Sequence, residues 1–179
     1  MTLIDLYKHW SPSRDHKSDR EAWAFPDAQP WSWIKDAKTV VDLGCGTGRM
    51  VQKMLAEGRD CVGVTYQEGE LGHDHVFLGD MHDLNFADAT FDAFLMWDSL
   101  EHCVAPLIAL AEARRVLRPR GRGIIFMPGE TWIEKDYHIH VMSPRQMKHL
   151  IVLAGLRLWE IREIGAEQVG AAFYLVEKP

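Results

Sequence analysis

A glycine-rich turn at residues 44–48 has the composition of a loop that binds a nucleotide-like ligand. Residues 40–48 read Val-Val-Asp-Leu-Gly-Cys-Gly-Thr-Gly, and an amphipathic run follows at once. Glycine permits positive φ angles and has no Cβ, so a ligand can approach the backbone closely. The N–H groups at the start of a helix then bind the polar part of that ligand. We therefore expect a nucleotide-like ligand over the end of the strand that precedes the turn.

The position of the third glycine distinguishes two kinds of ligand. A dinucleotide-binding turn has the spacing Gly-x-Gly-x-x-Gly. Here the third glycine, Gly48, comes one position early, and Arg49 stands where that pattern has a small residue. Together with Asp42 two residues before the first glycine, this spacing favours a ligand that has no phosphate. A nicotinamide-dependent oxidoreductase is therefore disfavoured.

A second group of residues has side chains that can accept or donate a proton. Asp98 and His102 follow one predicted strand, and His138 and His140 follow another. In an open α/β sheet, ligands bind beyond the carboxyl ends of the strands. His138 is therefore the first candidate for a general base, with Asp98 and His102 next. The structural alternative is that His138 and His140 alternate along an extended segment, one packed and one solvated.

The paired histidines do not by themselves predict a metal site. Two His-x-His pairs occur, His73 with His75 and His138 with His140. Metal ligation in proteins needs three or four converging ligands. Neither pair has a third ligand nearby in the sequence, so we expect no bound metal.

Strands and helices alternate along the chain from residue 39, which predicts a parallel sheet covered on both faces. The short connection at 165–170 makes the last strand antiparallel. The spacing of apolar residues predicts strands at 39–43, 61–65, 76–78, 91–97, 123–127, 156–164 and 171–177, and helices at 47–57, 105–117 and 144–154.

Local signals mark the ends of these helices. Gly58 and Gly155 end two of them, and Ser143 with the following proline begins the last. For the middle helix, the inward residues are predicted to be Leu107, Leu110, Ala111 and Leu117.

The first 38 residues are less regular and contain four of the seven tryptophans, Trp10, Trp23, Trp31 and Trp33. We expect residues 1–38 to be a leader that packs on the main domain, 39–179, or caps its ligand site.

Composition limits the class of protein and its partners. The net charge of −6 disfavours a nucleic acid as the main partner, because nucleic-acid-binding proteins usually carry a basic face. No apolar run approaches the roughly 20 residues that span a bilayer, and the N-terminus has no signal-peptide core. The three scattered cysteines, Cys45, Cys61 and Cys103, fit free thiols. These features predict a cytoplasmic protein.

From the glycine turn onward the sequence resembles the class I S-adenosylmethionine-dependent methyltransferases, most closely the methyltransferase-11 and ubiquinone-biosynthesis type. After the glycine turn, Gly79-Asp80 followed by Leu84-Asn85-Phe86 is similar to a second motif of that family. Leu100-Glu101-His102 and the turn at 112–123 resemble two more. The resemblance covers about residues 39–177. It implies a Rossmann-like, doubly wound, mostly parallel α/β sheet with an antiparallel last strand.

The resemblance also implies a cofactor and a reaction. S-adenosylmethionine would donate a methyl group to a small molecule by in-line displacement and leave as S-adenosylhomocysteine. By the same resemblance, the cofactor-binding residues are Asp42, Gly44, Cys45 and Gly46 for the methionine part, Asp80 and Met81 for adenine, and the Trp97 carbonyl for the ammonium group.

One position departs from the family pattern. The second strand of these enzymes usually ends in an acidic residue that binds both ribose hydroxyls, whereas this chain has Thr65. Thr65 can supply only one such bond, so Tyr66, Gln67 or Glu68 is expected to supply the other. The short interval between Thr65 and Asp80 also means that the helix between the second and third strands is short or missing. The apolar surface left there leaves room for a homodimer.

These departures keep a second function open. A domain of the same fold that binds the cofactor or a partner without catalysing methyl transfer is the alternative to an active enzyme. The sequence does not identify the methyl acceptor or its reacting atom.

Overall fold

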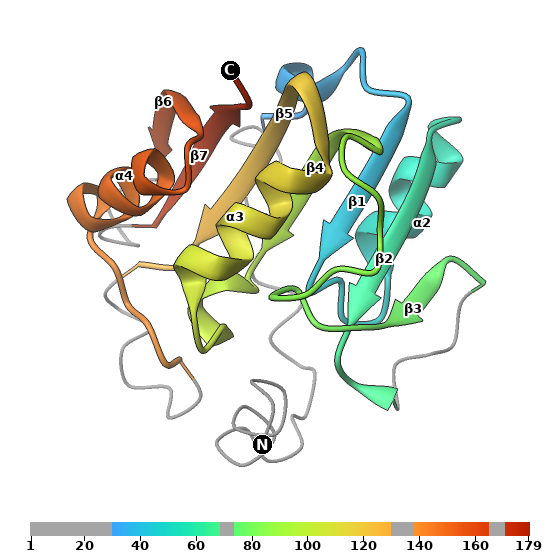
Figure 1. Cartoon of the computed structure of the whole chain (residues 1–179), viewed down its shortest axis with the longest axis horizontal. Coiled ribbons are helices and arrows are strands. Elements are labelled where there is room, and N and C mark those ends of the chain that lie inside the picture. Colours follow the sequence, from blue (N-terminus) through green and yellow to red (C-terminus); the bar gives the residue numbers. More distant parts are fainter. Residues whose placement is uncertain (1–29, 69–73, 130–137, 165–170) are drawn as a thin grey trace.

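The protein is built around a seven-stranded sheet with the strand order β3-β2-β1-β4-β5-β7-β6 (Figure 1). The computed structural model describes residues 30–68, 74–129, 138–164 and 171–179. The strands are β1 (Thr39–Leu43), β2 (Asp60–Thr65), β3 (Val76–Leu78), β4 (Phe91–Trp97), β5 (Leu117–Met127), β6 (Arg157–Glu163) and β7 (Ala172–Glu177). The helices are η3 (Trp31–Ile34), α2 (Arg49–Ala56), η5 (Leu100–His102), α3 (Pro106–Val116) and α4 (Pro144–Leu153).

The sheet is parallel except at one side. β1 pairs in parallel with β2 and β4, and β2–β3 and β4–β5 are also parallel. β7 runs antiparallel between β5 and β6. The predicted Rossmann-like fold with an antiparallel last strand is therefore confirmed. The carboxyl ends of β1 to β5 lie along one edge of the sheet, and the predicted site residues lie at or near these ends.

Helices cover both faces of the sheet, as predicted (Figure 1). α3 and α4 lie on one face, where their buried residues share a core with Val41 and Leu43 of β1. α2 and Ile34 of η3 lie on the other face and share a second core with Val40. Successive strand residues point to opposite faces, so one strand contributes to both cores.

The predicted inward face of α3 is partly wrong. Leu110 is buried, and so is Leu117, which follows the helix as the first residue of β5, but Leu107 is 39% exposed and Ala111 is also exposed. The buried side of α3 consists of Pro106, Ala109, Leu110, Ala113 and Val116. The apolar residues of this helix therefore cover more than one face, and only packing against the sheet selects the inward one.

The connection from β2 to β3 contains no α-helix in its described residues, 66–68 and 74–75. On the edge strand β3, Phe77 and Leu78 are 49% and 50% exposed. No helix of the described residues is long and apolar enough to cross a membrane.

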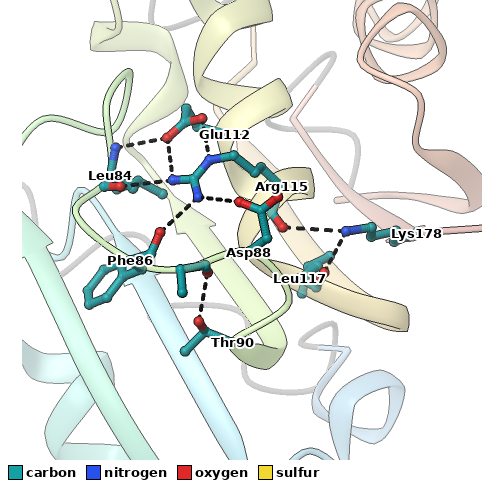
Figure 2. A network of polar contacts seen from close by, with 9 residues as sticks. Leu84, Phe86, Asp88, Thr90, Glu112, Arg115, Leu117 and Lys178 are labelled. Atoms are coloured by element: carbon teal, nitrogen blue, oxygen red, sulfur yellow. Dashed lines mark hydrogen bonds and ion pairs between the residues drawn. The ribbon is translucent and has the colours of Figure 1, made fainter.

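Arg115 of α3 fixes the segment between β3 and β4 (Figure 2). Its guanidinium donates to the Glu112 carboxylate at 2.7 and 2.8 Å and to Asp88 at 2.8 Å. It also donates to the carbonyls of Leu84 and Phe86, both at 2.8 Å. Glu112 in turn accepts from the Leu84 N–H at 2.9 Å, and these bonds hold the pKa of Glu112 below its usual value. The segment that follows Asp80 is thereby tied to α3.

Candidate active site

The glycine turn between β1 and α2 has the conformation that its sequence predicts. Gly44, Gly46 and Gly48 have φ angles of 78°, 52° and 80°, which other residues rarely adopt. The N–H groups of Gly44 and Cys45 both donate to the Val64 carbonyl, at 2.9 and 3.1 Å, so β2 holds the turn. A Cβ on Gly44 would lie 2.4 Å from the Ser99 Cβ. The turn therefore packs directly against the segment that follows β4.

Asp42 lies within β1, two residues before the turn, and it is only 2% exposed. Burial raises the pKa of Asp42 from 3.8 to about 7, because a carboxylate loses its hydration there. A cation placed beside this carboxyl favours its ionised form. Asp42 thus fits the cationic end of a ligand held by the glycine turn.

The end of β2 positions Thr65 and Tyr66. Thr65 is buried, and its hydroxyl accepts from the Gln67 N–H at 3.3 Å. The Tyr66 hydroxyl lies 2.7 Å from Gln67 Nε2. The three residues that stand where an acidic residue was expected are thus connected to one another.

The Cys45 side chain packs against β2. Its Sγ would lie 2.5 Å from a Cβ on Gly63, so the missing side chain of Gly63 makes space for it.

The end of β3 holds Asp80 in a chain of side-chain contacts that the sequence did not predict. Asp80 Oδ1 accepts from the His82 N–H at 2.9 Å and lies 2.5 Å from His82 Nδ1. His82 Nε2 accepts from the Ala105 N–H at 3.2 Å, which makes Nδ1 the protonated nitrogen. The Cys103 Sγ lies 2.9 Å from the same Nε2. This geometry fixes the Asp80 carboxylate at the edge of the sheet.

The Asp80–His82–Cys103 chain resembles a nucleophilic triad, but burial disfavours the thiolate form of its cysteine. Burial raises the pKa of the Cys103 thiol to about 12. A thiol with this pKa is protonated at neutral pH and is a poor nucleophile. The chain is therefore a positioning device for Asp80.

Met81 and Trp97 lie on either side of the glycine turn in the sheet order. The Met81 Cε would contact a Cβ on Gly44 at 3.1 Å, so this side chain reaches the turn from the β3 side. Trp97, the last residue of β4, stacks on Trp31 with ring centroids 5.3 Å apart and packs against Phe173 at 4.9 Å. Asp98, the next residue, has a φ of 47°, an uncommon conformation for a residue other than glycine.

The proposed proton-transfer residues are brought together only in part. Glu101, His102 and His138 each place one ligand atom within 4.8 Å of the others, and the rings of His102 and His138 are 4.9 Å apart. Glu101 and His102 are buried, while His138 is half-buried. The cluster unites residues from η5 and from the segment after β5, and it includes a carboxylate that sequence reasoning did not select.

Two residues were thus missed, His82 and Glu101, and each had a weak signal. His82 follows Asp80 by two positions, and Glu101 precedes His102 in a motif of the family. Their partners come from other elements, which spacing alone does not reveal. Trp10, Trp23, His73 and residues 130–137 lie outside the described residues, so the expectations that rest on them stay predictions.

The comparison with known proteins agrees with this geometry. Residues 41–125 match a family model described as a methyltransferase domain. This region is therefore similar to the domain of class I methyltransferases. S-adenosylmethionine is the cofactor of this class, as predicted. The matched region contains the glycine turn, Asp80, Trp97 and the η5 helix.

Individual relatives extend the match beyond the family model. An uncharacterized methyltransferase of Mycobacterium tuberculosis is 33% identical over 104 residues, which cover 54% of this chain and 42% of that protein. The chain thus spans less than half the length of the first curated relatives that it matches. A demethylmenaquinone methyltransferase of Corynebacterium urealyticum is 29% identical over 157 residues, covering 73% and 68% of the two chains.

A solved structure shows the same fold at low identity. The 1,6-didemethyltoxoflavin-N1-methyltransferase of Burkholderia thailandensis, crystallised with bound 1,6-didemethyltoxoflavin and S-adenosylhomocysteine, superimposes with a TM-score of 0.72. It is 19% identical to this chain, and the superposition covers 97% of this chain and 85% of that one.

Proposed function

We propose that this protein transfers the methyl group of S-adenosylmethionine to a small-molecule acceptor. The observation that carries the proposal is the turn at 44–48, whose three glycines all have positive φ and whose N–H groups at 44 and 45 are anchored to β2. The turn meets Ser99 so closely that a side chain on Gly44 would not fit. A turn of this kind can present its other backbone atoms, those not bonded to β2, to a ligand at the edge where β1, β2 and β4 end.

The residues around the turn fit the separate parts of the cofactor. Gly44, Cys45 and Gly46 are proposed to bind the methionine part through backbone atoms. The buried Asp42 and the carbonyl of Trp97 are proposed to bind its ammonium group, because a cation stabilises the ionised form of a carboxyl whose pKa burial has raised.

The remaining contacts are proposed at the ends of β2 and β3. Thr65 and Tyr66 would bind the ribose hydroxyls, with Gln67 supporting both side chains. Asp80 would accept from the adenine amino group, and the Met81 N–H would face a ring nitrogen. The two contacts to His82 orient the Asp80 carboxylate for this role.

The acceptor is proposed to lie beside Asp98, His102 and His138, which follow β4 and β5. When bound, S-adenosylmethionine supplies an electrophilic methyl group on a sulfonium. The protein's contribution to such a displacement is alignment of acceptor, methyl and sulfur, together with exclusion of water. The small size of the acceptor and the identity of these three catalytic residues belong to this proposal.

Calorimetry with S-adenosylhomocysteine tests the proposal, followed by turnover of isotope-labelled S-adenosylmethionine with a pool of small metabolites. We expect binding, and transfer of label to a small molecule. Gly58→Ala serves as a matched control for Gly44→Ala, since both glycines have a φ of 78° but Gly58 has no atom within 4 Å of its Cβ position. Gly44→Ala should abolish binding, and Gly58→Ala should not.

Absence of binding to the wild-type protein would refute the cofactor site. Binding without any label transfer would instead support the non-catalytic alternative.

A further inference from the structure

Three side chains at the acceptor end of the site form a set of donors that suits a metal ion. They are the carboxylate of Glu101 and the imidazoles of His102 and His138. His102 Nε2 lies 3.4 Å from Glu101 Oε1. A ring nitrogen of His138 lies within 4.8 Å of both of the other ligand atoms.

The 3.4 Å separation fits shared coordination better than a direct hydrogen bond. Hydrogen bonds from N–H to oxygen usually span about 2.7–3.2 Å. Two ligand atoms that lie about 2.0–2.1 Å from one tetrahedral ion are about 3.4 Å apart. The half-buried His138 has its ring nitrogen within 4.8 Å of the other two ligand atoms, so it would have to move by at most about 1.4 Å to reach the same 3.4 Å separation.

The backbone holds the two segments of this cluster together. The Glu101 carbonyl accepts from the N–H groups of Ile139 and His140, at 2.9 and 3.0 Å. These bonds keep His138 beside η5, although it is 36 residues beyond His102 in the sequence. Hydrogen bonds of the main chain therefore hold the three side chains near one another.

Burial adds an electrostatic argument. Glu101 is 0% exposed and His102 is 7% exposed. A divalent ion compensates the charge of a buried carboxylate strongly. Two histidines with one carboxylate are a ligand set that zinc and neighbouring transition metals use in catalytic sites, with a further position left open.

We propose that Glu101, His102 and His138 bind one divalent transition-metal ion of the zinc type. The open position would take water or the oxygen of the methyl acceptor, and this part rests on the proposed function. A hydroxyl bound there loses its proton to solvent more readily. Its oxygen then forms the new bond to the methyl carbon, while the carbon–sulfur bond breaks and sulfur keeps the electron pair.

The experiment uses the untagged full chain, stripped of metal with a chelator, and Co²⁺ as a spectroscopic probe that Zn²⁺ displaces. We expect one equivalent of Co²⁺ to give visible absorption bands. His138→Ala and the near-isosteric Glu101→Gln should weaken Co²⁺ binding by about 100-fold or more, because each removes one of three ligands. His149→Ala, a change at an exposed histidine of α4, should leave it unchanged.

Binding of much less than one equivalent would overturn the proposal, and so would a His138→Ala protein that binds Co²⁺ as tightly as wild type. Far-UV circular dichroism identifies any variant that fails to fold. His138→Ala should disturb folding least, because His138 is only half-buried. S-adenosylhomocysteine binding is measured separately on the metal-free protein. Metal binding without cofactor binding would refute only the proposed function, and the reverse would refute only the metal site.

Discussion

Replacing Asp42 with Asn should make the ligand-free protein more stable at high pH and remove a pH dependence that the wild type shows. Asp42 is 2% exposed in β1, and burial raises its pKa from 3.8 to about 7. The folded protein therefore binds the proton of this carboxyl more tightly than the unfolded chain does. Asn has nearly the same shape and no charge at any pH, so it isolates the contribution of the charge.

The direction and size of the effect follow from proton linkage. Because the folded-state pKa lies above the unfolded one, the stability that this proton provides is complete below pH 3.8. It is lost as the pH rises toward about 7 and is constant above that. At 1.36 kcal/mol per unit of pKa, the full loss is about 4 kcal/mol. About 2.5 kcal/mol of it falls between pH 5 and pH 8, which equals roughly 5–10 °C in Tm for a domain of this size.

The assay is urea unfolding of wild type and Asp42→Asn between pH 5 and pH 8, without ligand. Other groups titrate equally in both proteins, so only the difference between the two free energies of unfolding is interpreted. That difference should grow with pH in favour of Asp42→Asn. A difference that stays constant across this range would refute the assignment of the raised pKa to Asp42.

Cofactor binding should also depend on the ionisation of Asp42. If Asp42 binds the ammonium group, then S-adenosylhomocysteine favours the ionised carboxyl and binding releases protons near pH 6. Calorimetry in buffers of different ionisation enthalpy measures this release. Asp42→Asn should weaken binding and abolish the proton release, and release that persists in the variant would exclude the contact.

Three further predictions concern the framework of the site. Arg115→Lys keeps the charge but loses the forked contacts to Glu112, Leu84 and Phe86. Urea unfolding should therefore show that the free energy of unfolding falls by about 3 kcal/mol. The control Arg114→Lys should lower it by less than about 1 kcal/mol. Equal losses would contradict this role. Gly58→Ala should cost about 1 kcal/mol for its positive φ alone, and Gly44→Ala clearly more because of Ser99, again by urea unfolding. His82→Ala should weaken the binding of S-adenosylhomocysteine by about tenfold. It should weaken the binding of the inosine analogue, which has no adenine amino group, much less. Cys103→Ala is the control, and an equal loss of affinity for both ligands would show a merely structural effect.

The strands and the order of the fold could be predicted because they depend on local patterns. Apolar runs bounded by turn residues gave the bounds of β1, β3 and β4 without error, and the capping box at Ser143 confirms the start of α4. The extent of β5 could not be predicted in this way. It begins at Leu117 and crosses an Arg- and Pro-containing stretch that reads as a turn. Leu117 pairs with Phe91, and the Arg120 N–H and the Gly121 carbonyl bond to the backbone of Lys178, so contacts with distant segments extend β5 through this stretch.

The inward face of α3 and the clusters of the site were beyond sequence reasoning for a related reason. Leu107 and Ala109 are both suitable for a core, and the direction from which α3 approaches the sheet decides which is buried. In the same way, His138 meets Glu101 only because the carbonyl of Glu101 binds the 139–140 backbone. Such contacts between distant segments are set by tertiary structure and leave no periodic signal.

The proposed site differs most from the class I methyltransferase pattern where β2 ends. Without an acidic residue at position 65, the proposed ribose contact would depend on the hydroxyls of Thr65 and Tyr66, which give weaker hydrogen bonds than a carboxylate does. The proposed adenine contact has the opposite character, because Asp80 is oriented by two contacts to His82, which itself accepts a hydrogen bond from the Ala105 N–H. Binding energy is thus expected to shift from ribose toward adenine. The inosine analogue should therefore bind to the wild-type protein much more weakly than S-adenosylhomocysteine, and a small difference between the two ligands would contradict this account.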